Sequence, residues 1–155
     1  MQWLARRKHF APIPLGGPST NERPASGQET STGLWKPNDR MMELVPGDVV
    51  LVDLGIPLGS EAGFLRPAVV VSSAGLLRRN LTTIFVIPCT ARRRGVASHV
   101  ELAPDGSNGL ERTTWAQCEH LRSVERDRCL ELLGNVGVVA IEQMREIVAL
   151  LIDIR

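Results

Sequence analysis

The sequence predicts a mainly β domain of the α+β class, in which one C-terminal helix closes a small, strongly curved sheet. Two patterns carry this prediction. From Pro46 onward, short runs of β-branched residues alternate with glycine, proline and asparagine, at the spacing of a compact sheet joined by turns. Near the C-terminus, Ile141, Met144, Val148 and Leu151 recur at three- and four-residue intervals, which is typical of a helix laid against a sheet.

The composition is that of one globular unit. A chain of 155 residues, 43% of them hydrophobic, is long and apolar enough to fill a single core. The formal net charge of +1 gives no overall case for nucleic-acid binding, so such a case depends on where the charges cluster.

Cysteine usage and hydropathy indicate a cytoplasmic protein. Cys89, Cys118 and Cys129 form no C-x-x-C pair, and two of them lie in apolar runs, so we expect reduced thiols, no disulfide and no zinc. No apolar run reaches the roughly 18 to 20 residues that span a bilayer. The opening MQWLARRKHFAPIPLGG carries charges where a signal peptide is apolar, so we expect no membrane association.

Residues 1–45 are rich in proline, glycine, serine and threonine and have no helical or strand period, which predicts a disordered extension. In the alternative interpretation, the isolated Trp3, Phe10 and Trp35 dock on the domain or on a partner. Met41 and Met42 directly precede the first ordered pattern, so the true start of the protein could lie there.

The predicted elements follow one another from residue 46. Residues 55–63 (GIPLGSEAG) contain three glycines and a proline and predict a long mobile loop, and residues 74–80 predict a helical turn. Asp105–Gly109 (DGSNG) predicts a hairpin turn, because both glycines accept a positive φ. Residues 112–124 predict one long bent strand or two short ones. Further strands are expected at 47–54, 66–73, 82–90 and 98–102, and the third of these is apolar on both faces and therefore central.

The C-terminal helix is expected over residues 138–154 and carries a second apolar face. Val139, Ile147 and Leu150 lie opposite the first stripe. An apolar outer face on a terminal helix indicates a partner surface, and we expect a second copy of the chain there.

Six motifs in succession, PGDVVLVDL, GSEAG, RPAVVVS, VIPCT, SHVEL and EHLRSV, resemble the MazF/PemK (Kid) toxins of type II toxin–antitoxin systems. The resemblance covers the chain from about Pro46 to the C-terminus. It implies an SH3-like barrel core of the CcdB/PemK type and a homodimer. It also implies a metal-independent, sequence-specific endoribonuclease that cleaves single-stranded RNA by attack of the ribose 2′-hydroxyl. The products would carry 2′,3′-cyclic phosphate and 5′-hydroxyl ends, and a MazE-like antitoxin would be the cognate partner.

The resemblance also implies roles for individual residues. The functional arginine of the family's R-P pair corresponds to Arg66, and its functional threonine corresponds to Thr90. The acidic residue of the loop corresponds to Glu61, with Ser60 beside it as a substrate contact.

The chemistry of this reaction fits those residue types. In-line attack by a 2′-hydroxyl builds negative charge on the phosphoryl oxygens, and an enzyme without a metal needs fixed donors aimed at them. The planar fork of Arg66 suits a phosphate, and Pro67 biases residue 66 to an extended backbone. Thr90 would donate a hydrogen bond to the phosphate. The structural alternatives are a solvated strand-end arginine and a threonine that caps the adjacent turn.

One departure from the family pattern concerns His120, which stands where many relatives have glutamine. Histidine titrates near neutrality, so His120 either takes part in acid–base steps, stacks on a base or only donates a hydrogen bond. His99 is interpreted as structural.

Clustered cations add a case for RNA. Arg92, Arg93 and Arg94 directly follow Thr90 and could border the groove, or they are solvated loop charges, which is the interpretation favoured for Arg78 and Arg79 before the third strand. No aromatic motif for RNA stacking is present, and the single candidates are Trp115, for which core packing is favoured, and Phe64.

Two other functions remain open from the sequence. A CcdB-like poison of DNA gyrase resembles the same fold and acts by binding a protein. An inactive regulatory homologue is the other alternative. The pair Arg66 and Thr90 favours the nuclease, because a protein that only binds does not need it.

Overall fold

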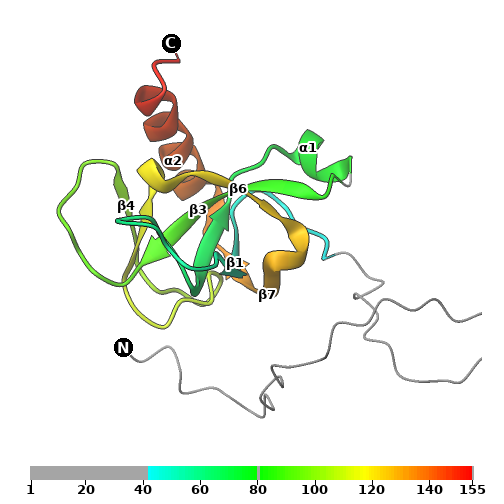
Figure 1. Cartoon of the computed structure of the whole chain (residues 1–155), viewed down its shortest axis with the longest axis horizontal. Helices are drawn as coiled ribbons and strands as arrows, with labels where there is room; N and C mark the ends of the chain where they lie inside the picture. The colour runs from blue at the N-terminus through cyan, green and yellow to red at the C-terminus, as the bar shows by residue number, and fades with distance from the viewer. Residues whose placement is uncertain (1–41, 80, 155) are drawn as a thin grey trace, which may run out of the picture. The chain divides into compact units, whose positions relative to one another are not determined.

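The computed structural model describes residues 42–79 and 81–154 (Figure 1). They belong to one compact unit. Most of the predicted N-terminal extension, with Trp3, Phe10, Trp35 and Met41, lies outside the described residues. Ordered packing begins ahead of Pro46, because Leu44 is buried in a core cluster and Met42 packs against it.

Most of the elements in the described residues are short strands, and a long helix is the last element. The loop of residues 55–63 separates the first two strands, as expected. Residues 112–124 form two short strands rather than one long one, with a turn of 3-10 helix between them. The elements are β1 (Asp48–Asp53), β2 (Leu65–Val70), α1 (Ala74–Arg78), β3 (Thr83–Thr90), β4 (His99–Leu102), β5 (Thr114–Gln117), η1 (Cys118–His120), β6 (Arg122–Glu125), η2 (Arg126–Arg128), β7 (Cys129–Asn135) and α2 (Gly137–Leu151).

The seven strands form one antiparallel sheet in the order β4-β5-β3-β2-β1-β7, with β6 paired to β3 outside this path. The predicted central position of β3 is confirmed, because β3 pairs with β2, β5 and β6. β5 pairs with the C-terminal end of β3 and β6 with its N-terminal half, so η1 forms a corner between them. The sheet is curled, but among the described strands β4 and β7 do not pair to close a barrel.

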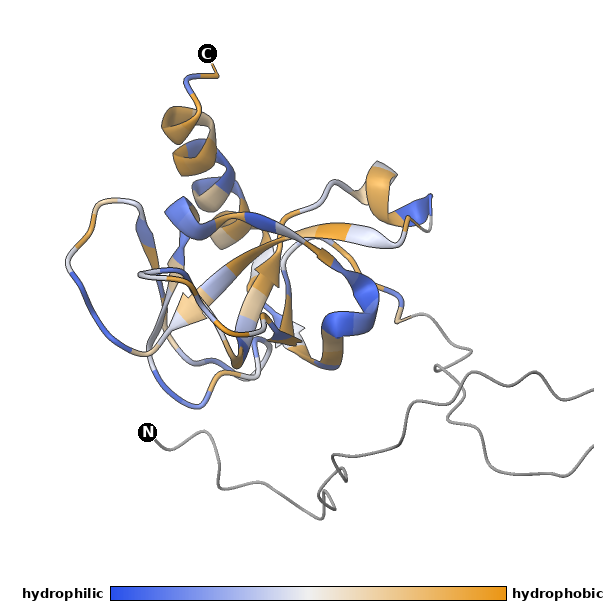
Figure 2. Cartoon of the chain, in the orientation of Figure 1, coloured by the Kyte–Doolittle hydropathy of each residue, from blue (hydrophilic) through white to orange (hydrophobic). Residues whose placement is uncertain are grey.

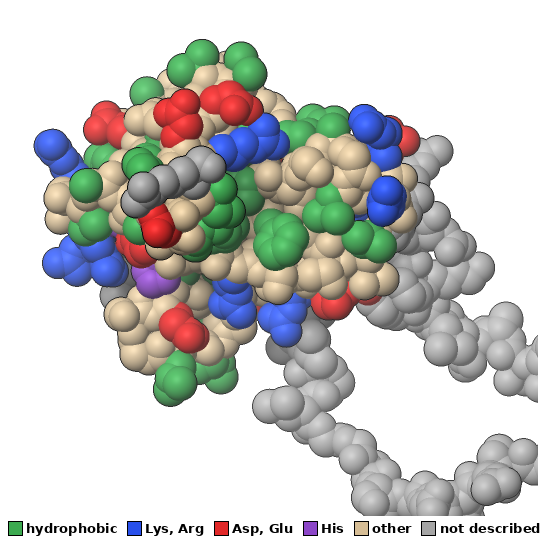
Figure 3. Space-filling view, turned by 90° about the horizontal axis from the view of Figure 1, so that it is seen from above, with side chains coloured by type: hydrophobic (Ala, Val, Ile, Leu, Met, Phe, Trp, Pro, Cys, Tyr) green, Lys and Arg blue, Asp and Glu red, His purple; other side chains and the backbone are tan. Residues whose placement is uncertain are grey.

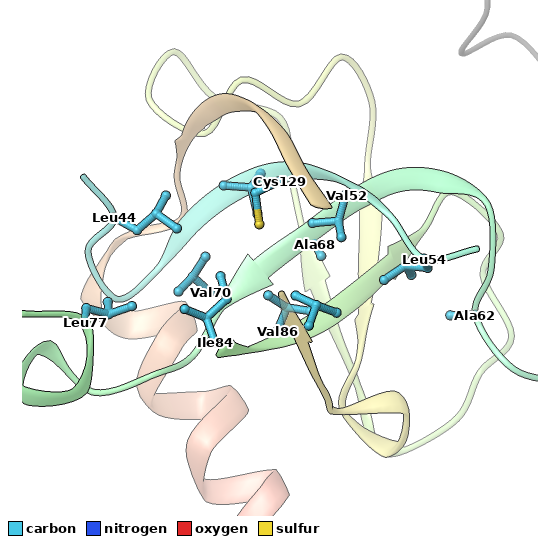
Figure 4. Packing of buried hydrophobic residues seen from close by; sticks show 12 residues of the cluster. Leu44, Val52, Leu54, Ala62, Ala68, Val70, Leu77, Ile84, Val86 and Cys129 are labelled. Atoms are coloured by element: carbon cyan, nitrogen blue, oxygen red, sulfur yellow. The ribbon is translucent and has the colours of Figure 1, made fainter. Parts of the chain in front are cut away.

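Buried residues fall into two clusters, one on each side of the sheet. The first, on the side away from α2, contains alternate residues of β1, β2 and β3, such as Val50, Ala68 and Val86. Figure 4 shows labelled members of this cluster, such as Val52, Ala68 and Val86, pointing toward one another between the strands. Because strand residues alternate in direction, Val49, Val69 and Ile87 enter the second cluster, on the side of α2.

α2 packs against the second cluster through Ile141 and Met144, as the sequence predicted. The predicted stripe is wrong at its C-terminal end, because Leu151 is half exposed, whereas Ile147, predicted for the outer face, packs against the core. The last turns of α2 extend beyond the sheet, so no strand covers Leu151 (Figures 1 and 2). In the described part of the chain, no helix combines the length and hydropathy of a membrane span.

β7 is the one strand of the structure that the sequence patterns did not predict. It pairs with β1 through a ladder with two register shifts. The predicted turn at Asp105–Gly109 is part of the connection between β4 and β5, and it packs against β7, since the Asn135 N–H donates to the Ser107 carbonyl at 2.8 Å. Of the two glycines, Gly109 has a positive φ of 67° and Gly106 does not.

All three cysteines are free and buried. Burial raises the pKa of the Cys89 and Cys118 thiols to about 12 each, and that of Cys129 to about 11. These thiols are therefore poor nucleophiles and serve as small apolar core residues.

Candidate functional site

Arg66 lies near the start of β2 and is held from both sides. Its backbone pairs with Val52 of β1, and its Nε donates to the Gly63 carbonyl at 2.6 Å. The side chain is half-buried, and this burial is the main cause that lowers the pKa of Arg66; the nearby Arg94 cation lowers it further, while Cys89 opposes the shift. An arginine nevertheless stays protonated at neutral pH, so Arg66 presents a fixed and partly desolvated positive charge.

Thr90 ends β3 at the same end of the sheet as Arg66. The ladder between β2 and β3 pairs Ala68 with Pro88, and Arg66 and Thr90 each lie two residues beyond this pair. Since side chains alternate along strands, both project from the face that carries Ala68 and Pro88. The Thr90 hydroxyl oxygen also accepts from the Arg92 N–H at 3.2 Å, so the turn-capping role is present, and the hydroxyl hydrogen is left for donation.

The same face continues sideways across β5 and β4. Thr90 is paired with Trp115, and Trp115 is paired with Glu101. Because Ala68 belongs to the first core cluster, this face is the one turned away from α2. Arg66 and Thr90 therefore lie at the rim of the sheet opposite the helix, with the half-buried Trp115 beside them.

The loop of residues 55–63 returns to the sheet next to Arg66. Glu61 turns back on its own loop, because its Oε2 accepts from the Leu58 N–H at 3.4 Å and its N–H donates to the Leu58 carbonyl at 3.3 Å. Ser60 is exposed at the tip of this turn.

Glu61 and His120, which the sequence predicted as RNA contacts, line the same hollow. Its volume is about 380 Å³. The loop contributes one wall and the corner between β5 and β6 contributes the other. The lining residues are Glu61, Ala62, Glu119, His120, Leu121 and Arg122. Carboxylates, an imidazole and a guanidinium thus converge on a space suited to a polar, planar ligand.

Glu119 organises the second wall of this hollow, and sequence reasoning gave it no role. Its Oε2 accepts from the Ser98 hydroxyl at 2.5 Å, and its Oε1 lies 2.7 Å from His99 Nε2 and 3.9 Å from His120 Nε2. Partial burial works to raise the pKa of Glu119, but the hydrogen bonds from Ser98, from its own backbone and from His99 outweigh it, and the net shift is downward. Glu119 is therefore an ionised carboxylate at neutral pH.

His99 fills the structural role expected of it. Its side chain is 3% exposed, and the bond to Glu119 ties β4 to the corner formed by η1. The contact joins residues 20 positions apart. The position of Glu119, an acidic residue directly before His120, was the sequence signal that could have singled it out.

The basic residues divide between the site and the rest of the surface. Arg92, Arg93 and Arg94 are exposed in the segment after β3, and the Arg94 cation contributes to the lowered pKa of Arg66, whose main cause is burial. Arg78 and Arg79 lie at the end of α1, before the opposite end of β3. Figure 3 shows the basic side chains in separate groups on the face seen from above, without one continuous patch.

No three His, Cys, Asp or Glu side chains come together as a possible metal site within residues 42–79 and 81–154. The hydrogen-bond donors at the rim are the Arg66 guanidinium and the Thr90 hydroxyl, which suit an anionic ligand.

Fold and site together define a small α+β protein with a curled antiparallel sheet. On the side of the sheet away from α2, its rim carries the cationic Arg66 beside Thr90. The family model described as PemK-like, MazF-like toxin of type II toxin–antitoxin system matches residues 45–154, and the chain belongs to this family.

Similar proteins agree with this assignment. Endoribonuclease MazF9 of Mycobacterium tuberculosis (strain ATCC 25618 / H37Rv) is 34% identical over 112 residues, which cover 70% of this chain and 95% of that protein.

Solved structures confirm the fold. MazF (Form-I) from Deinococcus radiodurans matches with a TM-score of 0.60 at 24% identity, over 71% of this chain and 96% of that one. An endoribonuclease from a mycobacterial species, in complex with its cognate antitoxin, matches with a TM-score of 0.59 at 20% identity, over 72% and 97%. The expected mainly β fold with a C-terminal helix is thus confirmed.

Proposed function

We propose that this chain is a toxin that acts in the bacterial cytoplasm as a sequence-specific endoribonuclease on single-stranded RNA. The observation that carries the proposal is the position of Arg66 and Thr90, at the same end and on the same face of two neighbouring strands, in a chain of the MazF-like family. Neither the three buried thiols nor the second core cluster offers a competing reactive site.

In this mechanism, the 2′-hydroxyl of one ribose attacks the adjacent phosphorus in line, and the 5′-oxygen of the next nucleotide leaves. The P–O5′ bond breaks as the P–O2′ bond forms, the 2′-hydroxyl gives up its proton, and the departing 5′-oxygen takes one up. The products are therefore a 2′,3′-cyclic phosphate and a 5′-hydroxyl. Arg66 stabilises the charge that develops on the phosphoryl oxygens, and Thr90 donates a second hydrogen bond to them. Both donors are fixed before the substrate binds, because Arg66 is tied to Gly63 and Thr90 to Arg92.

We assign proton transfer to His120, which lines the hollow. An arginine is a poor general base, whereas an imidazole exchanges protons near neutral pH. His120 is partly exposed, with 20% of its side chain accessible, and the ionised Glu119 lies beside it. Replacing His120 with glutamine tests this role, since unchanged cleavage sites and an unchanged pH–rate profile would contradict it.

The hollow itself suits the edge of a base. Its carboxylates repel phosphates but accept hydrogen bonds from the amino groups of bases, and Arg122 can donate to base carbonyls. Glu61 and His120, with Ser60 at the loop tip, would therefore contribute to sequence preference, while Arg92, Arg93 and Arg94 attract the RNA backbone.

Two partners complete the proposal. A MazE-like antitoxin, usually acidic, would cover the cationic rim and mask Arg66. A second copy of the chain would pack on the outer face of α2. The exposed apolar residues of α2 and of the segment that follows it are Val138, Val139, Leu150, Leu151, Ile152 and Ile154.

The decisive experiment incubates the purified protein with a long, defined RNA in the presence of EDTA. We expect fragments whose 5′ ends accept phosphate from polynucleotide kinase without prior dephosphorylation, and whose 3′ ends are cyclic phosphates. The Arg66→Ala variant should leave most of the RNA uncut over the time in which the parent cleaves it. Growth arrest that does not depend on Arg66, with RNA intact in the parent assay, would contradict the nuclease and support a protein-binding poison.

A further inference from the structure

Phe64 has a backbone conformation that an aromatic residue rarely adopts. Its φ is 60°, and the one other non-glycine residue with a positive φ in the described part of the chain is Asp153, near the C-terminus. A bulky side chain is strained in this region, and such strain persists only where the surroundings enforce it.

The two ends of the loop, at residues 54–55 and 63–64, lie together and form a neck, which enforces this conformation. The Phe64 N–H donates to the Gly55 carbonyl at 2.6 Å, and the Phe64 carbonyl accepts from the Leu54 N–H at 3.2 Å. On the other side, Gly63 packs so closely on the Pro57 ring that a Cβ would not fit, and its carbonyl holds Arg66. The position of residue 64 is therefore fixed relative to the Arg66 guanidinium.

The ring of Phe64 belongs to neither core cluster. It is 60% exposed, so it contributes little to either core cluster. Glycine would adopt the same φ without strain. Backbone strain and an exposed apolar ring are both unfavourable for the folded monomer. The presence of phenylalanine at this position therefore indicates a role in binding.

We propose that the Phe64 ring is a stacking platform for one base of single-stranded RNA, next to the phosphate that Arg66 binds. The inference rests on the proposed nuclease function and assigns the aromatic contact which that function lacks. Stacking on an aromatic ring is sequence-tolerant and is a general means of holding single-stranded nucleic acid. Because the ring and the guanidinium are joined through the same rigid neck, stacking would set the position of the phosphate.

The test is Phe64→Gly, which removes the ring and keeps both neck hydrogen bonds. The ligand is a fluorescein-labelled single-stranded RNA that spans a mapped cut site and carries one 2′-deoxynucleotide there, so that it is not cleaved. We expect a Kd about 5- to 150-fold higher than that of the parent, from the usual range for one stacked base. The thermal midpoint should equal or exceed the parent's, because the strain is relieved.

Two further variants separate stacking from a merely structural role. Phe64→Trp should bind this RNA as the parent does. Leu65→Ala, which truncates the neighbouring apolar residue, also exposed, should keep parental affinity as well.

The outcomes distinguish this inference from the proposed function. A parent that cleaves RNA, with a Phe64→Gly variant of unchanged Kd, would overturn the stacking role alone, including the case in which the ring serves a protein partner. A Phe64→Gly variant that unfolds at a lower temperature would also overturn it. A parent that leaves RNA intact would overturn both.

Discussion

Arg66 differs from a solvated strand-end arginine in what surrounds it. Strand pairing fixes its backbone, the Gly63 carbonyl fixes its Nε, and burial removes part of the water that would screen its charge. The remaining guanidinium N–H groups can face a phosphate. The planar fork, as well as the charge, is therefore expected to matter.

We expect Arg66→Ala to lower kcat by about 100- to 1000-fold, the usual effect of removing one transition-state donor. Arg66→Lys should recover only a small part, because a lysine cannot both bond to Gly63 and present a fork to the phosphate. Single-turnover cleavage of a defined RNA measures both.

Arg78→Ala is the matched control, since Arg78 is exposed at the end of α1. Its cleavage rate should stay close to the parent's. Parental activity in Arg66→Ala would contradict the proposed site.

Glu119 should contribute to stability in a pH-dependent way. Its pKa is lowered in the folded protein, so its contribution is complete above the pKa of the unfolded chain and is lost as the pH falls through the folded-state pKa. We expect Glu119→Gln to reduce the free energy of unfolding by about 1 to 2 kcal/mol at neutral pH, from the loss of charge-assisted hydrogen bonds at a partly exposed site.

Urea unfolding of the parent and of Glu119→Gln at neutral pH and at about pH 3 measures this difference. The two proteins should become more similar in stability at the acidic pH. A difference that stays constant across this range would show that the carboxylate charge is not involved.

At the scale of elements, the connection between β4 and β5 is held against β7 by close backbone contact. Gly109 has a φ of 67°, and a Cβ there would collide with the Leu133 carbonyl. Gly134 of β7 approaches the Ser107 carbonyl in the same way. Two glycines thus allow the connection and the strand to touch.

Gly95 provides a comparison that isolates this contact. Its φ of 64° is nearly that of Gly109, but a Cβ there would meet open space. We expect Gly95→Ala to cost about 1 kcal/mol from backbone strain alone, and Gly109→Ala to cost about 3 kcal/mol or more. Denaturant unfolding monitored by circular dichroism gives both values, and equal costs would contradict the close approach.

Sequence patterns predicted elements where burial follows a regular period. β1, β2 and β3 are runs of β-branched residues with a buried core, and all three were predicted. β7 was not, because Leu130 and Leu132 are exposed and two register shifts interrupt its pairing with β1, so no period of two is visible. The stripe of α2 failed at Leu151, since the helix extends past the sheet that would bury that residue.

The candidate site was predictable only in part for a similar reason. Arg66 and Thr90 stand at strand ends that motifs mark. The contact of Glu119 with His99 depends on the register of β4 and β5, which places His99 opposite Gln117, and on the turn at η1 that follows, and no local pattern encodes that register.

At the scale of the whole molecule, the proposed site and the proposed dimer surface lie on opposite sides of the sheet. The rim with Arg66 lies on the side away from α2, and the exposed apolar residues of α2 lie on the other. A second copy bound to α2 would therefore leave the rim of the same chain open.

We expect the parent to be a dimer and Val139→Glu combined with Leu150→Glu to be a monomer, because charges on this face would repel across the interface. Val139 is 80% exposed and Leu150 is 78% exposed, so the fold should survive. Analytical ultracentrifugation at several concentrations measures the mass. A dimer that persists in the double variant would place the interface elsewhere.

The pairing of β7 with β1 has a consequence for synthesis of the protein. Asn135 donates to Asp48 at 2.9 Å, and these two residues are 87 positions apart. Contacts of such separation form late, because a long loop must first close. On the ribosome, β1 therefore has no neighbour on this side until residues 129–135 have emerged, so the sheet of a nascent chain stays incomplete until then.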